Sequence, residues 1–394
     1  MSSAPPLKDN RREPLSLDRL IAVIIKEFTQ LRRDRLTLGM LIGIPLMQLI
    51  MFGYAINGDP KHLPTALVVH EHSTYTRSLT RALENSGYFV IVKADTSEAE
   101  ADDLLALGDV QFVLTIPAGF SRALERGERP ALLLEADATD PAATGNALAT
   151  LAQITQTALA HDLKGTAAAR LTAPAGAAVA APFEWRIHRR YNPEGRTQFN
   201  IVPGLTGVIL TMTMIMMTSL GIAREVERGT MENLLATPVR PLEVMVGKIA
   251  PYIVIGYVQT AIILLAARYL FEVPFAGNLV TLLGCVLAFI IASLSVGITI
   301  SSISHSQAQA MQMTFFFFLP SILLSGFMFP FRGMPEWAQF VGDLLPLTHF
   351  LRLIRGVMLK GNELHELWPN LWPLAAFTLV VMSIGLKRFR RTLD

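Results

Sequence analysis

The stretch Leu279–Ser301 reads LVTLLGCVLAFIIASLSVGITIS and contains no charged side chain. A helix of roughly 20 apolar residues is long enough to cross the ~30 Å hydrocarbon core of a bilayer. We therefore expect this stretch to span a membrane. The only cysteine of the chain, Cys285, lies inside it, which excludes an intramolecular disulfide and favours a small packing residue.

Five further apolar runs without charge have a similar character. They are Leu36–Ile56, Ile201–Ala223, Ile249–Ala267, Met311–Phe331 and Leu371–Leu386. The whole chain is 51% hydrophobic and 17% charged, whereas a soluble domain has about a quarter of its residues charged. The fold class predicted from these runs is an α-helical polytopic membrane protein with six transmembrane helices.

The positions of lysine and arginine orient the spans, because basic residues are enriched on the cytoplasmic side. The first span is preceded by Arg11, Arg12, Arg19, Lys26, Arg32, Arg33 and Arg35, and the last is followed by Lys387, Arg388, Arg390 and Arg391. Both groups place the two termini in the cytoplasm, as in a multi-pass protein of the bacterial inner membrane. Arg352, Arg355 and Lys360 fall on the outer side in this scheme and oppose it.

The residues before the first span predict an amphipathic helix. Apolar side chains recur at helical spacing at Leu17, Leu20, Ile21, Ile24, Phe28 and Leu31. Such a helix is expected to lie along the cytoplasmic membrane surface. The alternative is a helix that packs on the cytoplasmic face of the protein itself.

The long polar segment 57–199 is expected outside the cytoplasm as an inserted α/β domain. Short apolar runs predict strands at Thr65–His70, Phe89–Ala94, Val110–Ile116 and Ala131–Glu135. Helices are expected at Ser78–Asn85, Ser97–Leu107, Ser121–Arg126 and Asn146–Leu163, and Ser97 with Glu100 fits a capping box. The alanine-rich stretch Gly165–Pro182 is either a linker or part of a helix.

Enzymatic and metal chemistry have little support in the residues. No Walker motif occurs, and Gly247-Lys248 lacks the upstream glycine that a phosphate-binding loop needs. We therefore expect no ATP site, no cofactor and no catalytic residue in this chain. His62, His70 and His72 lack a fixed further ligand, which favours polar residues at a strand end over a metal site. A net charge of +2 does not favour nucleic acid as a partner.

The loop between the second and third spans reads EVERGTMENLLATP from Glu225 to Pro238. Gly229 can end the helix that leaves the membrane, and Thr230 can cap a new one with Glu232 in its first turn. Pro241 is placed to open the following helix. The pattern predicts a short helix across the cytoplasmic mouth that is available to a partner; the alternative is a well-capped turn.

This loop resembles the first coupling-helix region of type-2 ABC transporter permeases. Two further stretches are similar to that family: Tyr191-Asn192-Pro193 ahead of Phe199–Gly204, and Leu345–Phe350 followed by Ile354–Gly361. The resemblance covers nearly the whole chain, and the three motifs together are specific. The family also places short re-entrant helices before its last span, where the opposing Arg and Lys residues fall.

The resemblance implies a subunit of a dimeric ATP-driven exporter. Two permease chains, identical or homologous, are expected to bind two copies of an ATPase subunit, with a periplasmic adaptor and an outer-membrane channel as further partners by analogy. The implied ATPase-coupling residues are Glu225, Glu227, Arg228, Gly229, Thr230, Glu232, Leu234, Leu235 and Pro238. The implied organisation is a tail and elbow helix at 1–35, the first span at 36–56, the outer domain at 57–199, and the remaining spans at 200–394 with the coupling loop at 224–248.

The substrate path is expected on methionine- and phenylalanine-rich spans. Met212 and Met216 share one face of the second span, whereas Met214 lies on another, and Phe316 belongs to a run of four phenylalanines. Methionine adapts to differently shaped apolar surfaces, and aromatic faces attract cations. The expected cargo is an apolar or amphiphilic molecule, drug-like or lipid-like. The alternative is that these side chains pack against neighbours or lipid.

Two other function classes remain open from the residues. A membrane receptor or sensor could use the outer domain to bind a ligand, although the sequence shows no cytoplasmic signalling domain. A secondary transporter usually carries ionisable groups at mid-membrane, and the six runs contain none.

Overall fold

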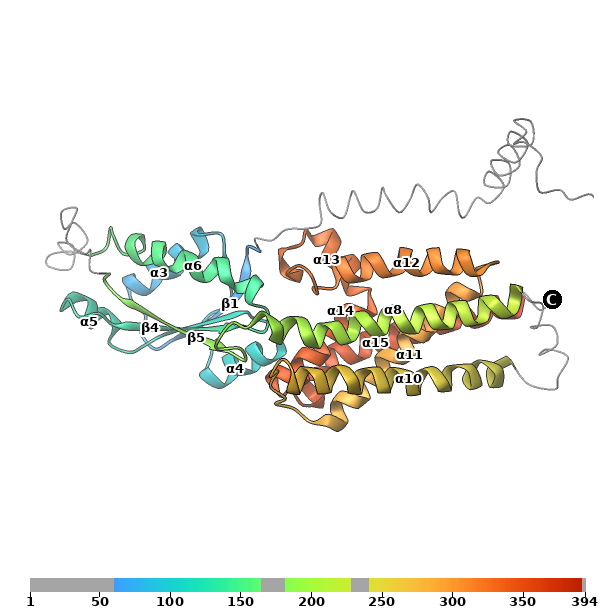
Figure 1. The fold of residues 1–394 in the computed structure, drawn as a ribbon. Helices are drawn as coiled ribbons and strands as arrows, with labels where there is room; N and C mark the ends of the chain where they lie inside the picture. The colour runs from blue at the N-terminus through green and yellow to red at the C-terminus, as the bar shows by residue number, and fades with distance from the viewer. Residues whose placement is uncertain (1–59, 164–180, 228–240, 392–394) are drawn as a thin grey trace, which may run out of the picture. The chain divides into compact units, whose positions relative to one another are not determined.

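The computed structural model describes residues 60–163, 181–227 and 241–391. Within them, a five-stranded sheet with four covering helices precedes a helical bundle (Figure 1). The expected interfacial helix before residue 36, the first span at Leu36–Ile56 and most of the linker at Gly165–Pro182 lie outside the described residues.

The sheet has the strand order β2-β1-β3-β4-β5. Its strands are β1 (Leu63–Val69), β2 (Phe89–Lys93), β3 (Phe112–Ile116), β4 (Ala131–Asp137) and β5 (Glu184–Arg190). All neighbours pair in parallel except β3 and β4, which are antiparallel. The four predicted strands are confirmed, with small shifts at their ends. The edge strand β5 was not predicted.

Helices cover both faces of the sheet (Figure 1). Helices α3 (Thr74–Asn85) and α6 (Pro141–Thr157) bury leucines against one face, together with α5 (Phe120–Glu125). Helix α4 (Glu98–Leu107) covers part of the other face through Ala101 and Leu105.

The caps explain where these helices begin. Ser97 caps α4, since its Oγ accepts a hydrogen bond from the Glu100 amide at 3.2 Å. The Glu100 carboxylate instead pairs with Lys93, so only half of the predicted capping box forms. Helices α3 and α6 begin four to five residues earlier than predicted, because Ser73 and Asp140 accept hydrogen bonds as their N-caps.

Four helices are long and apolar enough to cross a membrane among the described residues. They are α8 (Thr197–Glu227), α10 (Pro241–Tyr269), α11 (Leu279–Ser301) and α15 (Leu364–Arg391). The prediction for Leu279–Ser301 is confirmed at both ends, and α10 opens at Pro241 as predicted. In α8 and α11, 56% of the apolar window is buried, against 17% in α10 and 11% in α15, so α8 and α11 are the central helices.

The predicted fifth span, Met311–Phe331, is wrong at its C-terminal end. Helix α12 covers Gln307–Leu324 and is not among the four span candidates. The chain then turns at Gly326, whose φ of 83° lies in the left-handed region, and forms the 3₁₀ turn η2 at Phe331–Gly333. An unbroken apolar run therefore hides a helix end, because phenylalanine and leucine are as compatible with a buried turn as with a span.

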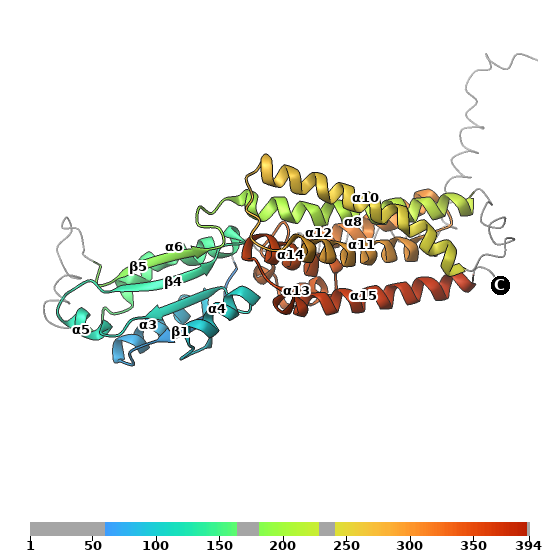
Figure 2. The ribbon, with the colours of Figure 1, turned by 90° about the horizontal axis from the view of Figure 1, so that it is seen from below.

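Short helices close the bundle at the end that faces the sheet (Figures 1 and 2). They are α13 (Glu336–Asp343), α14 (Pro346–Arg355) and the π-helical turn η3 (Gly356–Lys360). Helix α14 is almost entirely buried, and its Phe350 stacks on Phe289 of α11 with ring centroids 4.1 Å apart. We call the end of the bundle that these short helices close the domain-side end, and the opposite end the far end.

Candidate translocation surface and its two ends

The two central helices approach each other closely at a glycine. A Cβ atom added at Gly297 of α11 would lie 2.8 Å from Thr218 Cβ and 3.0 Å from the Ile215 carbonyl oxygen of α8. Small residues allow such backbone approach where no hydrophobic effect drives helices together in lipid. This contact fixes α8 against α11.

Helix α12 lies beside α8 on another side. Ser219 Oγ and Thr314 Oγ1 are 3.1 Å apart and buried between the two helices. Buried hydroxyls need a partner, so this pair specifies how α8 and α12 face each other.

The predicted substrate-path residues are at least partly accessible on helices α8 and α12. Met212 and Met216 are partly buried and share a face of α8 with Ile209, which is 38% exposed. Met214 lies on another face, as the helical spacing predicted, and it is fully buried. Phe316 of α12 is 41% exposed. The structure therefore places the three predicted residues on accessible apolar surface of neighbouring helices; their role stays a prediction.

At the far end, a carboxylate from α8 holds the start of α12. The backbone amide of Gln307 donates to Glu227 Oε1 at 3.2 Å, and its Nε2 donates to Glu227 Oε2 at 2.6 Å. Arg224 Nε donates to Gln307 Oε1 at 3.4 Å. We call this set the Glu227–Gln307 latch.

One predicted coupling residue has a partner within the chain, and its coupling role stays a prediction. Glu227 contacts the chain's own helix α12, a contact that spacing along the sequence could not reveal. Glu225 is partly buried at the end of α8. The remaining predicted coupling residues lie outside the described residues: Arg228, Gly229, Thr230, Glu232, Leu234, Leu235 and Pro238.

At the domain-side end, Lys360 joins the bundle to the sheet domain. Its Nζ donates to Asp137 Oδ2 at 2.6 Å, and only 9% of either side chain is exposed. The same ammonium donates to the carbonyl oxygens of Leu105 at 3.0 Å and Ala106 at 3.4 Å, at the C-terminus of α4. Helix C-termini carry partial negative charge and attract cations. Lys360 therefore satisfies a carboxylate and a helix end at once.

Two further donors from the bundle reach the same helix end. Asn362 Nδ2 donates to the Ala106 oxygen at 3.1 Å, and Arg332 Nη2 donates to the Gly108 oxygen at 2.7 Å. With Lys360, they supply donors for carbonyls that a helix terminus leaves unpaired. We call Lys360, Asp137, Asn362 and Arg332 the outer junction.

The three basic residues that oppose the predicted orientation all have partners inside the protein. Lys360 pairs with Asp137, and Arg352 Nη2 donates to Asp343 Oδ1 at 2.9 Å. Both terminal nitrogens of Arg355 donate to the Gly326 oxygen at 3.3 Å. They serve local packing, so they carry little information on orientation.

The motif before α8 builds a tight corner next to the junction. Tyr191 has a φ of 67° and its ring centroid is 5.2 Å from Lys360 Nζ. Burial, followed by the nearby Asp137 carboxylate, raises the pKa of Tyr191 to about 12. Asn192 is fully buried. Its Nδ2 donates to the Arg196 carbonyl oxygen at 3.0 Å, and its Oδ1 accepts from the Arg196 backbone amide at 2.9 Å. Its side chain therefore closes the turn into α8.

A cavity of about 480 Å³ lies between the sheet domain and helices α13 to α15. Arg332, Arg355 and Asp140 line it, and burial raises the pKa of Asp140 and lowers that of Arg355. The Nε atom of Arg355 has no hydrogen-bond partner among the described residues. Because the lining mixes both charges, this cavity is suited to water and polar groups and not to an apolar cargo.

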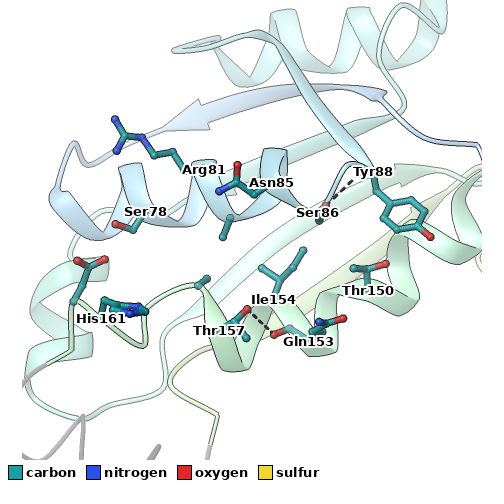
Figure 3. A pocket seen from close by; sticks show the side chains of 13 residues that line it. Ser78, Arg81, Asn85, Ser86, Tyr88, Thr150, Gln153, Ile154, Thr157 and His161 are labelled. Atoms are coloured by element: carbon teal, nitrogen blue, oxygen red, sulfur yellow. Dashed lines mark hydrogen bonds between the residues drawn. The ribbon is translucent and has the colours of Figure 1, made fainter.

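A second hollow of about 730 Å³ opens between α3 and α6 on the sheet domain (Figure 3). Its labelled side chains include Arg81 and Asn85 from α3 and Gln153 and Thr157 from α6, with Ile154 buried among them. The groove is polar and contains none of the predicted site residues.

The three histidines do not converge. His70 Nε2 lies 3.4 Å from Glu98 Oε1, and His72 Nε2 lies 3.4 Å from Asp95 Oδ1. Two residues that are two positions apart share a face only in an extended strand. Strand β1 ends at Val69, so His70 and His72 lie beyond it and do not share a strand face. Among the described residues, no group of three or more His, Cys, Asp and Glu could hold a metal ion.

Known proteins show similarity along most of the chain. Residues 35–387 match the model of a family described as "ABC-2 family transporter protein". "Probable multidrug ABC transporter permease YbhR" of Escherichia coli K12 is 28% identical over 95% of this chain and 98% of that protein. "Inner membrane transport permease YhhJ" of Escherichia coli K12 is 27% identical over 94% and 96%. "Linearmycin resistance permease protein LnrN" of Bacillus subtilis is 21% identical over 89% and 94%.

The family match covers the central helices, the sheet domain and the junction between them. The resemblance inferred from the three motifs is confirmed. The chain belongs to the ABC-2 family of transporter proteins as a permease.

Proposed function

We propose that this chain is the membrane-spanning subunit of an ATP-driven exporter that moves an apolar or amphiphilic substrate. The observation that carries the proposal is the accessible apolar surface on α8 and on α12, with the latch at the far end of the bundle and the outer junction at its domain-side end. The names of the relatives add support, since two of them refer to multidrug transport and linearmycin resistance.

In this proposal the chain has six spans in the bacterial inner membrane. Span one is Leu36–Ile56, α12 is span five, the sheet domain is periplasmic, and both termini are cytoplasmic. Cysteines introduced at Glu128 and at Thr237 in a Cys285→Ala background test the orientation. Glu128→Cys should react with an impermeant thiol reagent from the periplasm, and Thr237→Cys should react only after the inner membrane is opened. The opposite order would overturn the orientation.

The loop at Glu225–Pro238 is proposed to dock a separate ATPase subunit. The short capped helix that its sequence predicts and its family resemblance support this role. Glu232→Lys should weaken ATPase binding or uncouple it while the membrane fold stays intact, because the change lies outside the spans. Co-purification and substrate-stimulated ATP hydrolysis measure the effect. Normal values for both would remove Glu232 from the coupling surface.

The proposed assembly contains two permease chains and two ATPase subunits. The exposed apolar surface of α8 and α12 would then be covered partly by the second chain. A periplasmic adaptor and an outer-membrane channel complete the proposed export path. Native mass measurement of the complex purified from its membrane tests the stoichiometry, and a copy number of one permease chain would contradict it.

Transport by the reconstituted complex tests the function itself. Proteoliposomes that contain permease and ATPase should move hydrophobic, lipid-like or cationic amphiphiles in an ATP-dependent manner. Met212→Ala, Met216→Ala and Phe316→Ala should each change the preference among several amphiphiles, because these side chains would line the path. Val258→Ala is the matched control, since Val258 of α10 is 54% exposed on a peripheral helix. Export of only a small hydrophilic ion would contradict the proposed cargo class.

A further inference from the structure

The far end of the bundle contains an arrangement that the proposed function does not explain. Glu227 is one of the last helical residues of α8, and Gln307 is the first residue of α12, 80 positions later. Both donors of Gln307 on this side, the backbone amide and Nε2, go to one carboxylate.

This carboxylate completes the cap of α12. The first amides of a helix have no partner within it, and a negative charge is favourable at that end. Ser306 serves one of these amides, because its Oγ accepts from the Gln309 amide at 3.2 Å. Glu227 serves another, that of Gln307. The start of α12 is therefore capped by two side chains: Ser306, the residue before the helix, and Glu227 of α8.

The two helices are also tied deeper in the bundle. Ser219 and Thr314 form their buried hydroxyl pair about two helical turns away from the latch. Two ties at different depths fix both the spacing and the rotation of α12 against α8. A displacement of the end of α8 therefore acts directly on α12.

We propose that Glu227 and Gln307 form the transmission element between the coupling loop and α12. In this role, Glu227 is a positioning residue: it passes a displacement of the loop to the helix that carries Phe316. The inference deepens the proposed function and rests on it. It differs from the role implied by the resemblance, in which Glu227 contacts the ATPase.

Gln307→Ala separates these two roles. It removes the bond from Nε2 and the contact with Arg224 and leaves the Glu227 carboxylate in place. If Glu227 acted only on the ATPase, this change would be silent. If the latch transmits movement, substrate transported per ATP should fall roughly threefold or more, in line with the loss of a hydrogen bond to a charged group at an exposed site.

The experiment uses the reconstituted permease–ATPase complex. ATPase binding, basal hydrolysis, substrate transport and Tm are measured for the wild type, Gln307→Ala and Gln312→Ala. Gln312→Ala is the matched control, because Gln312 lies on the same helix five residues from the latch. The expected result is that Gln307→Ala lowers transport per ATP at unchanged ATPase binding and Tm, while Gln312→Ala behaves as the wild type.

A double variant with exchanged side chains tests whether the loss of transport in Gln307→Ala comes from the missing contact with Glu227. In Glu227→Gln with Gln307→Glu, the amide and the carboxylate exchange places and Arg224 gains a carboxylate partner. The swap should restore at least half of the transport per ATP that Gln307→Ala loses. Wild-type coupling in Gln307→Ala, or no recovery in the swap, would overturn the transmission role. A wild-type chain that binds no ATPase would instead overturn the proposed function.

Discussion

The two ends of the bundle are built from different kinds of polar contact. At the outer junction, Lys360 and Asp137 are each 9% exposed, and the ammonium has further partners on the end of α4. At the far end, the Glu227–Gln307 latch is exposed. A charge pair excluded from water is costly to break, whereas an exposed contact exchanges readily with water.

This difference suggests which end is fixed and which can change during a transport cycle. The outer junction joins the sheet domain to the bundle through residues far apart in the chain, and removing Lys360 leaves the buried Asp137 carboxylate without its ion-pair partner. The exposed latch contributes less to stability, so the ends of α8 and α12 can shift together at a modest free-energy cost. Four variants test this contrast and the packing around it, from the largest expected effect to the smallest.

Lys360→Met should be the most destabilising change. It leaves the Asp137 carboxylate buried without its partner and the end of α4 without two hydrogen bonds. Removing one member of a buried ion pair costs about 3–5 kcal/mol in the free energy of unfolding. Thermal and denaturant unfolding in detergent measure it.

The control for this change is the double variant Asp137→Asn with Lys360→Met. The introduced amide oxygen could still accept from the Thr139 amide and hydroxyl, which now bond Asp137 Oδ1 at 3.1 Å and 2.8 Å. Much of the lost stability should return, because no unpaired charge remains. Equal unfolding of the wild type and Lys360→Met would show that the junction contributes little to stability.

Gly297→Ala should come second. Its new Cβ would meet the Ile215 oxygen at 3.0 Å and Thr218 Cβ at 2.8 Å, so α8 and α11 must move apart. Overpacking of this kind costs about 1–3 kcal/mol. Gly284→Ala on the same helix is the matched control, since nothing lies within 4 Å of its Cβ position. It should be neutral or stabilising by a few tenths of a kcal/mol, because alanine favours helix. Similar Tm values for both variants would contradict the close packing.

Glu227→Ala should change stability by less than about 1 kcal/mol, since the latch is exposed. Its effect is instead expected on transport per ATP, as for Gln307→Ala. Measuring Tm and transport on the same preparation separates the two readouts. A large fall in Tm would mean that the far end is as fixed as the outer junction and would remove the contrast.

Asp140→Asn should have the smallest effect, visible only as a pH dependence. Burial raises the pKa of the Asp140 carboxyl in the folded protein above its ordinary value of 3.8. The stability that this group contributes is complete below that value and is lost as pH rises through the folded pKa. Asparagine keeps the N-cap of α6 and does not titrate.

The Tm difference between Asp140→Asn and the wild type should therefore grow in favour of the variant as the pH is raised from about 3.5 to 7. Asp140→Ala, which also removes the cap, is the comparison that isolates the cap from the charge. A difference independent of pH would contradict the raised pKa.

The elements that sequence reasoning placed well are those whose signal is local. The span at Leu279–Ser301, the strands β1 to β4 and the cap at Ser97 each depend on residues next to one another. Strand β5 was missed because Glu184–Arg190 reads EWRIHRR, a largely charged stretch in which only Trp185 and Ile187 are apolar and alternate with polar residues. It pairs along its length with β4, and the Trp185 Nε1 donates to Thr155 of α6 at 2.8 Å. The partner strand, and not the intrinsic preference of the stretch, makes it a strand.

The sequence by itself determined that this protein is a membrane protein, where most of its spans run and that Ser97 caps a helix. Lipid demands continuous apolar runs, and caps act over three or four residues, so both can be read along the chain. Only the tertiary structure decided that Lys360 meets Asp137 across 223 positions and that Glu227 holds Gln307 across 80. Such pairs depend on which helix ends come together in space, and that follows from packing between elements and not from the order of residues within any one of them.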